Sequence, residues 1–260
     1  MREAVFRSVD GQDWGLPAPS RWQLLRGHFG EAMTLATDRW TARREVKRFG
    51  RERSMHRDPV LLSIGSGRTV PEGWLGIDRK VGPRVFNFDL RFTLPLADAS
   101  VGGILCEHIL EHFTLDDLPR MLKDYRRMLV PGGGLRIASP DALLIASLIR
   151  GDDDERTKRQ LDFDADIHRW IPTDPMLRWR VANRMAYQFG QHHTLLSAEL
   201  MARLLEQSGF SQIRSVKVWE SDYFGVIPTT HFDRFPAAEH EVFVVEAVKP
   251  DSSLDPGAVP

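Results

Sequence analysis

Glycines and a carboxylate follow two short apolar runs near the start of the second quarter of the chain. Gly65, Ser66 and Gly67 come directly after the run Val60–Ile64, and Asp78 ends the next run. Glycines let a backbone approach a ligand closely, and a carboxylate can accept hydrogen bonds from both hydroxyls of a ribose. These residue types, in this order, predict a nucleotide-type site at the ends of parallel strands.

The spacing of these residues disfavours a dinucleotide such as NAD. The third glycine of the dinucleotide fingerprint is absent, because Val70 stands at the matching position. Only about ten residues separate Gly67 from Asp78, too few for the full helix whose N-terminus would bind a pyrophosphate. A nucleoside without phosphates fits better, and S-adenosylmethionine (SAM) is the common one.

Two more polar positions follow apolar runs farther along the chain. Asp89 comes after Val85–Phe88, and Glu107 with His108 comes after Val101–Cys106. Ligands of open α/β sheets bind at the carboxyl ends of the strands. The recurrence of polar residues at such ends is therefore more specific than the glycine pair alone.

Histidines supply candidate catalytic groups. His108, Glu111 and His112 match the H-x-x-E-H pattern of a zinc protease, but that pattern needs a long helix, whereas His108 is expected at a strand end. We therefore predict no metal, with His108 in the pocket and His112 on a helix surface. His193, beside His192, is either a loop residue or a general base at the pocket mouth.

Strands and helices are expected to alternate, which predicts an α/β fold with a doubly wound, Rossmann-like, seven-stranded and mostly parallel sheet. The expected strands are Val60–Ile64, Trp74–Ile77, Val85–Phe88, Val101–Cys106, Leu135–Ala138, Ile213–Trp219 and Val242–Val248. The expected helices run from Thr114 to Leu129, from Asp141 to Arg150, and from a Ser197 cap to Gly209. Pro131 and three glycines are expected to stop the first helix and turn the chain.

The chain is expected to form one domain with attachments. We expect residues 1–57 to form a helical N-terminal extension and residues 58–250 to form the main domain. Residues 251–260 are expected to form a disordered tail. Residues 151–196 interrupt the alternation and predict an insertion that forms an acceptor pocket or lid.

Composition limits the function classes. The 260 residues carry a net charge of −1, which weighs against a nucleic-acid partner, and the basic stretch 39–57 is interpreted as a solvated helix face. The single cysteine, Cys106, cannot form an internal disulfide and suits a reducing compartment. The sequence shows neither a signal peptide nor a membrane span, which predicts a cytoplasmic protein.

Several segments together resemble a known family. They are LLSIGSG followed by GWLGID, FNFDLRFTLPLADASVGGILCEHILEHF, YRRMLVPGGGLRIASPD and the C-terminal FVVEAVKP. The chain resembles the class I SAM-dependent methyltransferases, and within them the predicted methyltransferases whose first motif reads like LNLGCG…GW.NID. The likeness spans roughly residues 60–141, with a weaker echo from His192 to Lys249.

The resemblance implies SAM as cofactor and a role for each matched position. Gly65, Ser66 and Gly67 would line the methionine part of SAM, and Asp78 would bind the ribose hydroxyls. The remaining matched positions are Asp89 facing the adenine amino group, Leu90 as the adjacent backbone donor, and Glu107 with His108 beside the methionine end. Two positions depart from the family pattern: Ser63 replaces a common acid, and a loop around Arg68–Gly73 replaces the first helix.

The function expected from the resemblance is transfer of a methyl group from SAM to a hydroxyl or amine of a small molecule or glycan. His108 and His193 are the candidate catalytic residues. The alternative, motivated by Ser63 and the missing helix, is a SAM-binding pseudoenzyme or regulatory protein without catalysis. Nucleic-acid methylation is disfavoured, and the sequence predicts neither the acceptor nor the oligomeric state.

Overall fold

The computed structural model describes residues 44–55, 58–68, 70, 72–80, 82–225 and 239–251. The chain divides into two compact units, Met1–Arg44 and Glu45–Pro260, and the elements named below belong to the second. Residues 45–54 are helical. The rest of the expected N-terminal extension, and the expected tail after Asp251, lie outside the described residues. No helix in the described ranges is long and apolar enough to cross a membrane.

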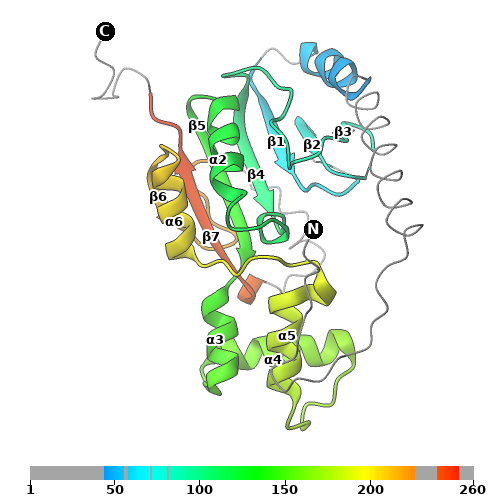
Figure 1. Ribbon diagram of the computed structural model, residues 1–260, viewed down its shortest axis with the longest axis vertical. Coiled ribbons are helices and arrows are strands. Elements are labelled where there is room, and N and C mark those ends of the chain that lie inside the picture. The colour runs from blue at the N-terminus through cyan, green and yellow to red at the C-terminus, as the bar shows by residue number, and fades with distance from the viewer. Residues whose placement is uncertain are drawn as a thin grey trace, which may run out of the picture. The chain divides into compact units, whose positions relative to one another are not determined.

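A seven-stranded sheet forms the centre of the described domain, with the order β3-β2-β1-β4-β5-β7-β6 (Figure 1). The strands are β1 (Val60–Ile64), β2 (Trp74–Ile77), β3 (Val85–Phe86), β4 (Val101–Glu107), β5 (Leu129–Pro140), β6 (Ser211–Ser215) and β7 (Val242–Val248). Neighbouring strands from β3 to β5 pair in parallel, and β7 lies antiparallel between β5 and β6. The predicted mostly parallel, doubly wound fold is confirmed.

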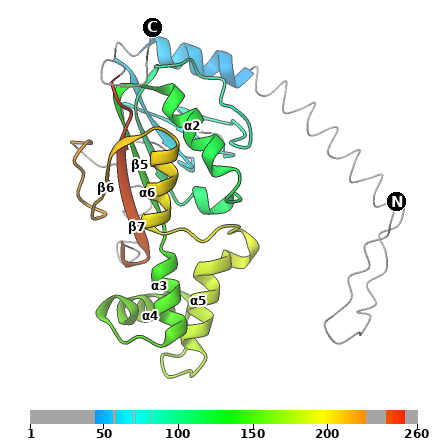
Figure 2. The same ribbon diagram turned by 60° about the vertical axis from the view of Figure 1, so that its left-hand side comes forward.

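Helices complete the domain. They are α2 (Leu118–Met128), α3 (Ala142–Arg150), α4 (Glu155–His168), α5 (Leu177–Tyr187) and α6 (Ala198–Gln207), with 3₁₀ turns η1 (Leu110–His112) and η2 (Gln188–Gly190). Helix α2 buries Leu118, Met121, Leu122 and Tyr125, whose three- and four-residue spacing places them on one face. Helices α2 and α6 contact each other and lie on the same face of the sheet, α2 against β5 and α6 against β6 and β7 (Figures 1 and 2).

Helices α3, α4 and α5 form a separate group beyond the carboxyl ends of β4 and β5 (Figures 1 and 2). The group has its own apolar cluster, made of Leu144, Ile145, Leu148, Ala165, Leu177, Val181, Ala182 and Met185. An isolated parallel bridge joins Asp141, directly after β5, to Leu196, shortly before α6, so the two ends of the intervening segment lie side by side. The Asp141 side chain also caps α3 by accepting a hydrogen bond from Leu143 N.

Buried ion pairs fasten this helical group to β7. The Arg184 guanidinium donates to both Asp164 on α4 and Glu241 at the start of β7, with distances of 2.8 Å from Nη2 to each. Arg156 on α4 likewise reaches Asp141 at 2.6 Å and the carbonyl oxygen of Val242 at 3.1 Å. These contacts leave little freedom between the helical group and the sheet.

Four predicted strands have wrong bounds: the third and the sixth, the fourth, which ends at Glu107 instead of Cys106, and the fifth, which runs from Leu129 to Pro140 instead of from Leu135 to Ala138. The third strand ends at Phe86 instead of Phe88, because the backbone amide of Asn87 donates to the Glu45 carboxylate at 3.1 Å rather than to a strand. The sixth predicted strand, Ile213–Trp219, is β6 in the structure, which begins at Ser211 and ends at Ser215. A bulge between Ser211 and Arg214 shifts its register against β7.

The segment after α2 also differs from its prediction. The glycines that follow Pro131 do not form the expected turn, because they lie inside β5, which begins at Leu129. Within this strand Gly134 pairs with both Gly103 and Val248. Helix α2 itself starts at Leu118, four residues later than expected. Thr114 donates its backbone N–H and its hydroxyl to the Asp117 carboxylate and so forms a turn before the helix.

Candidate active site

The glycine turn after β1 needs glycine at both of its ends. Gly65 has φ +77° and Gly67 has φ +71°, in the left-handed region that other residues avoid. A Cβ on Gly65 would lie 3.0 Å from Cβ of Ile109, whereas a Cβ on Gly67 would meet nothing within 4 Å. Steric contact with Ile109 therefore excludes a side chain at position 65. The backbone at Gly67 instead faces open space that a ligand can fill.

The Asp78 carboxylate stabilises this turn from the end of β2. Its Oδ2 accepts a hydrogen bond from Gly67 N at 2.8 Å, and its Oδ1 accepts one from Lys80 N at 2.8 Å. Each carboxylate oxygen has a second lone pair, so Asp78 can still accept from ribose hydroxyls. No helix interrupts the described residues between β1 and β2, as the spacing predicted.

The other residues predicted on this side contact neighbouring parts of the chain, and among them the buried Ser66 hydroxyl has no hydrogen-bond partner within the described residues. The Ser66 hydroxyl lies against β2, because a Cβ on Gly76 would be 2.4 Å from its oxygen. The Asp89 carboxylate binds Arg91 through Nε and Nη2, and the hydrogen bond from Arg91 lowers the pKa of Asp89. Leu90 packs against the core, and its carbonyl oxygen accepts from Arg120.

The chain turns sharply where β4 ends. Glu107 is the last, buried residue of the strand, and His108 follows with φ +49°, a conformation in which histidine is enriched among non-glycine residues. The backbone N–H of His108 donates to the carbonyl oxygen of Ala138 on β5 at 2.9 Å. The turn leads directly into η1, which carries Glu111 and His112.

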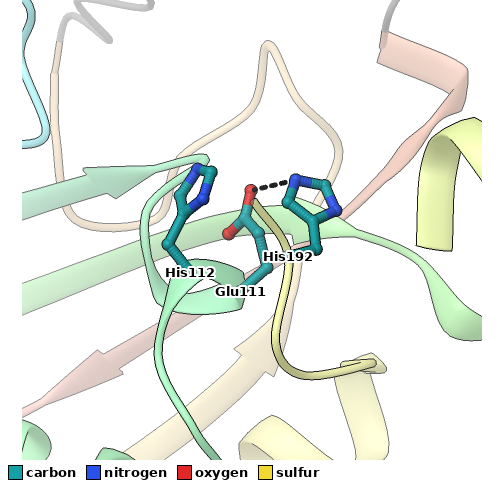
Figure 3. Close-up of side chains that lie close together, drawn as sticks. All are labelled: Glu111, His112 and His192. Atoms are coloured by element: carbon teal, nitrogen blue, oxygen red, sulfur yellow. Dashed lines mark ion pairs between the residues drawn. The ribbon is translucent and has the colours of Figure 1, made fainter. Parts of the chain in front are cut away.

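Glu111 is the centre of a buried polar cluster (Figure 3). The residue is 2% exposed, and its Oε2 accepts a hydrogen bond from the Ser139 hydroxyl at 3.0 Å. Its Oε1 lies 3.4 Å from Nδ1 of His108 and 4.0 Å from Nε2 of His192. The strand end, η1 and the distant loop after α5 therefore meet at one carboxylate.

His192 and His112 complete the cluster. Nδ1 of His192 lies 2.8 Å from the carbonyl oxygen of Met185, and Nδ1 of His112 lies 3.0 Å from that of Gln191. The two rings meet edge to face with centroids 5.1 Å apart. Glu111, His112 and His192 each offer one ligand atom within 4.8 Å of the others, a set that could hold a metal ion.

The loop that carries His192 is tied to the same residue through its backbone. The N–H groups of His193 and Thr194 donate to the carbonyl oxygen of Glu111 at 2.8 and 3.2 Å. The His193 side chain is exposed, whereas the neighbouring His192 is buried in the cluster. The structure thus places the predicted catalytic residues apart: His108 contacts Glu111, and His193 points its side chain to the surface.

Burial and charge act differently on the members of this cluster. Burial lowers the pKa of His108, but the hydrogen bond and charge of Glu111 outweigh it and raise that pKa above its usual value. Burial likewise raises the pKa of Glu111, but the hydrogen bond and charge of His108 outweigh it and lower that pKa. Burial lowers the pKa of His192. Burial raises the pKa of the Cys106 thiol well above its usual value, which removes this residue as a nucleophile.

Sequence reasoning did not group Glu111, His112 and His192. His112 was expected on a helix surface, but it is half-buried on a 3₁₀ turn. The available signal was the combination of the His-x-x-Glu-His spacing with a histidine pair about 80 residues later, and only the tertiary contacts join the two. Two cavities, of about 560 and 580 Å³, are lined mainly by the segment that follows β6, the second also by Asp141, Arg156 and the start of β7, and neither is lined by the glycine turn.

Comparison with known proteins identifies part of this region. A family model described as "Methyltransferase domain" matches residues 75–137, from β2 to β5. The matched range includes Asp78, Asp89, Leu90, Glu107 and His108 and stops short of the glycine turn. No curated protein sequence matches the chain.

Solved structures match the chain at low sequence identity. The CurJ carbon methyltransferase is 16% identical, with a TM-score of 0.39 over 75% of this chain and 49% of its own, so the chain spans about half its length. A SAM-dependent methyltransferase from Archaeoglobus fulgidus is 16% identical, with a TM-score of 0.43 over 88% and 100%. A Burkholderia thailandensis 1,6-didemethyltoxoflavin-N1-methyltransferase, solved with S-adenosylhomocysteine, is 17% identical, with a TM-score of 0.42 over 92% and 94%.

The family match and the strand order agree with each other. The matched segment supplies the strands β2 to β5 of a sheet in which β1 and β4 are neighbours. Residues 75–137 are therefore similar to a methyltransferase domain over strands β2 to β5.

Proposed function

We propose that this chain transfers the methyl group of SAM to a hydroxyl or amine of a small molecule or glycan, in the cytoplasm. The observation that carries the proposal is the contact between the glycine turn and the segment after β4, where Gly65 packs against Ile109. Because β1 and β4 are adjacent and parallel, a cofactor on the turn would have His108 and Glu111 beside it.

The residues of the glycine turn fit a nucleoside cofactor. Gly65 and Gly67 hold the backbone in a left-handed turn, the side of Gly67 is open, and Asp78 fixes the turn from β2. In this proposal Gly65, Ser66 and Gly67 bind the methionine part, Asp78 the ribose, and Asp89 with Leu90 the adenine. When bound, SAM supplies an electrophilic methyl group on a sulfonium sulfur.

The protein's own task is to position an acceptor and to remove its proton. Methyl transfer is an in-line displacement, so much of the rate comes from holding the acceptor atom close to the methyl carbon. Glu111 contacts Nδ1 of His108 and so orients the imidazole, an arrangement typical of a general base with a supporting carboxylate. Glu107 lies directly before this base, and His193 is a second candidate at the mouth of the site.

Helices α3, α4 and α5 are the proposed walls of the acceptor pocket. They stand beyond the carboxyl ends of β4 and β5, on the edge of the sheet where His108 lies (Figure 1). The Arg184 and Arg156 ion pairs hold them against β7. A wall fixed in this way can exclude water from the reacting groups.

Calorimetric titration with S-adenosylhomocysteine tests the cofactor site. We expect micromolar binding to the wild type, a loss of at least tenfold in affinity for Asp78→Ala, and no change for the exposed control Asp116→Ala. A radiolabelled-SAM assay across acceptor classes then tests turnover, with His108→Asn expected to lower kcat and leave cofactor binding intact. No binding to wild type at millimolar concentration contradicts the proposal, and binding without turnover on any acceptor supports the SAM-binding protein instead.

A further inference from the structure

The hydrogen bonds of His112 and His192 determine which ring nitrogens carry protons. A backbone carbonyl oxygen can only accept, so Nδ1 of each ring must donate to its carbonyl, at 3.0 Å to Gln191 and 2.8 Å to Met185. In a neutral imidazole the other nitrogen, Nε2, is then an acceptor. Histidines that bind metals in proteins are oriented in the same way, with the second nitrogen donating to a carbonyl or carboxylate.

The acceptors of the cluster face one another in a dry environment. The side chain of His192 is 3% exposed and that of Glu111 is 2% exposed. Among the described residues, Nε2 of His192 is buried without a hydrogen-bond partner, and it points at Oε1 of Glu111 from 4.0 Å (Figure 3). Two lone pairs that face each other across a buried gap repel, and a cation between them removes the repulsion.

We propose that Glu111, His112 and His192 bind a divalent transition-metal ion, Zn²⁺ in the first instance. Two imidazoles and one carboxylate form the ligand set of catalytic zinc sites, in which a fourth position stays open. The set also suits other metals late in the first transition row, so the ion bound in the cell depends on its availability. Mg²⁺ and Ca²⁺ fit poorly, because they prefer oxygen ligands.

The surrounding residues also hold each proposed metal ligand in place, as metal sites in proteins require. Ser139 holds Oε2 of Glu111, and the backbone N–H groups of His193 and Thr194 hold its carbonyl oxygen. His112 and His192 are held by their Nδ1 hydrogen bonds. If the proposed methyl transfer holds, the open position would receive water or an oxygen atom of the acceptor, and the ion would polarise an acceptor hydroxyl.

A competing explanation uses no metal. A protonated His108, 3.4 Å from Oε1, would neutralise the charge of Glu111 by itself. That explanation leaves Nε2 of His192 without a partner and predicts that the protein binds no transition metal at this place. Metal binding therefore separates the two explanations.

The test is metal content of the full chain, purified without a histidine tag. After chelator treatment and gel filtration with one equivalent of Zn²⁺, mass spectrometry is expected to find one zinc per chain, and competition with a chromophoric chelator a submicromolar Kd. His192→Ala and Glu111→Gln are expected to weaken binding at least 100-fold. The matched control is His193→Ala, which removes the adjacent exposed histidine and is expected to leave the zinc affinity unchanged.

Two further readouts keep the test decisive. Co²⁺ in place of zinc should give the visible absorption of a tetrahedral site in wild type and lose it in His192→Ala. Circular dichroism and S-adenosylhomocysteine titration of each variant show whether the fold and the cofactor site survive, so a failure of the metal site is distinguishable from a failure of the proposed function. Zinc absent from the wild type, or bound equally by all variants, overturns the proposal.

Discussion

The glycine half of the sheet edge, residues 65–89, and the histidine half, residues 108–112 with His192, treat their carboxylates differently. Asp78 and Asp89 receive hydrogen bonds from backbone N–H groups or from Arg91. Glu111 receives one from Ser139, while its second oxygen faces histidine nitrogens at 3.4 and 4.0 Å. The first half is also partly open to solvent, whereas Glu111 and His192 are buried.

The difference shows how each half prepares for a ligand. A loop whose polar groups are already paired keeps its shape without the cofactor and offers its remaining lone pairs at little cost. A buried group of acceptors is unfavourable until a cation or a donor arrives. The glycine half is thus preorganised by its own hydrogen bonds, and the histidine half gains stability on binding.

The largest effect is expected from Gly65→Ala in the glycine half. The new methyl group meets Ile109 at 3.0 Å and forces alanine into φ +77°, which together cost about 3 kcal/mol. Thermal melting and S-adenosylhomocysteine titration should both show the loss. Gly50→Ala is the control, since it lies in a helix with nothing within 4 Å, and it should be neutral or slightly stabilising. Equal melting temperatures for Gly65→Ala and wild type would show that the glycine turn is not fixed by the contact between Gly65 and Ile109.

The next effect is expected from Asp78→Asn. Both oxygens of Asp78 accept from backbone N–H groups, so an amide NH₂ must face one of those donors and costs about 2 kcal/mol. Urea unfolding measures this cost, and cofactor affinity should fall about tenfold or more with it. An unchanged midpoint would mean that the carboxylate does not stabilise the turn.

The same change of acid to amide should cost less in the histidine half. In Glu111→Gln the amide oxygen can still accept from Ser139, and the NH₂ group can donate to Nε2 of His192. We expect the metal-free variant to lose at most about 1 kcal/mol in urea unfolding, because the new hydrogen bond to His192 offsets part of the lost interaction with His108. Added zinc should stabilise wild type alone. Destabilisation like that of Asp78→Asn would show that the two halves are built alike.

The smallest effect concerns pH in the glycine half. Arg91 lowers the pKa of Asp89, so the pair stabilises the fold above the usual aspartate pKa and loses this contribution as pH falls through the lowered value. Arg91→Ala should return the pKa of Asp89 toward about 3.9, as measured by carboxyl-carbon NMR. Melting temperatures should barely change, because the pair is partly exposed. A pKa that stays low would assign the shift to another group.

Much of the sheet could be predicted from the sequence, because buried parallel strands are continuous apolar runs that end in glycine or an acid. β1, β2 and β7 match their predicted bounds, and Ser197 caps α6 as expected. The length of β5 could not be predicted, because glycines after Pro131 carry the composition of a turn and become a strand only through pairing with β4 and β7.

In the candidate site, too, the residues that follow apolar runs could be predicted from the sequence, and those placed by tertiary contacts could not. Gly65, Asp78 and His108 were placed by local patterns, each directly after an apolar run. His192 could not be chosen over His193 from the sequence, since adjacent residues in a loop have no periodicity to separate them. The choice is made by the carbonyl oxygen of Met185 and by Glu111, which come from other elements.

The bridge between Asp141 and Leu196 has an evolutionary consequence. Because Asp141 and Leu196 pair with each other, the 54 positions between them (142–195) form a roughly self-contained insertion whose two ends are closed by one contact. Lengthening, replacing or recombining α3, α4 and α5 need not move any strand, provided that partners for Asp141 and Glu241 are kept. Related chains could therefore diversify their acceptors by exchanging this one segment while the sheet and its glycine turn stay the same.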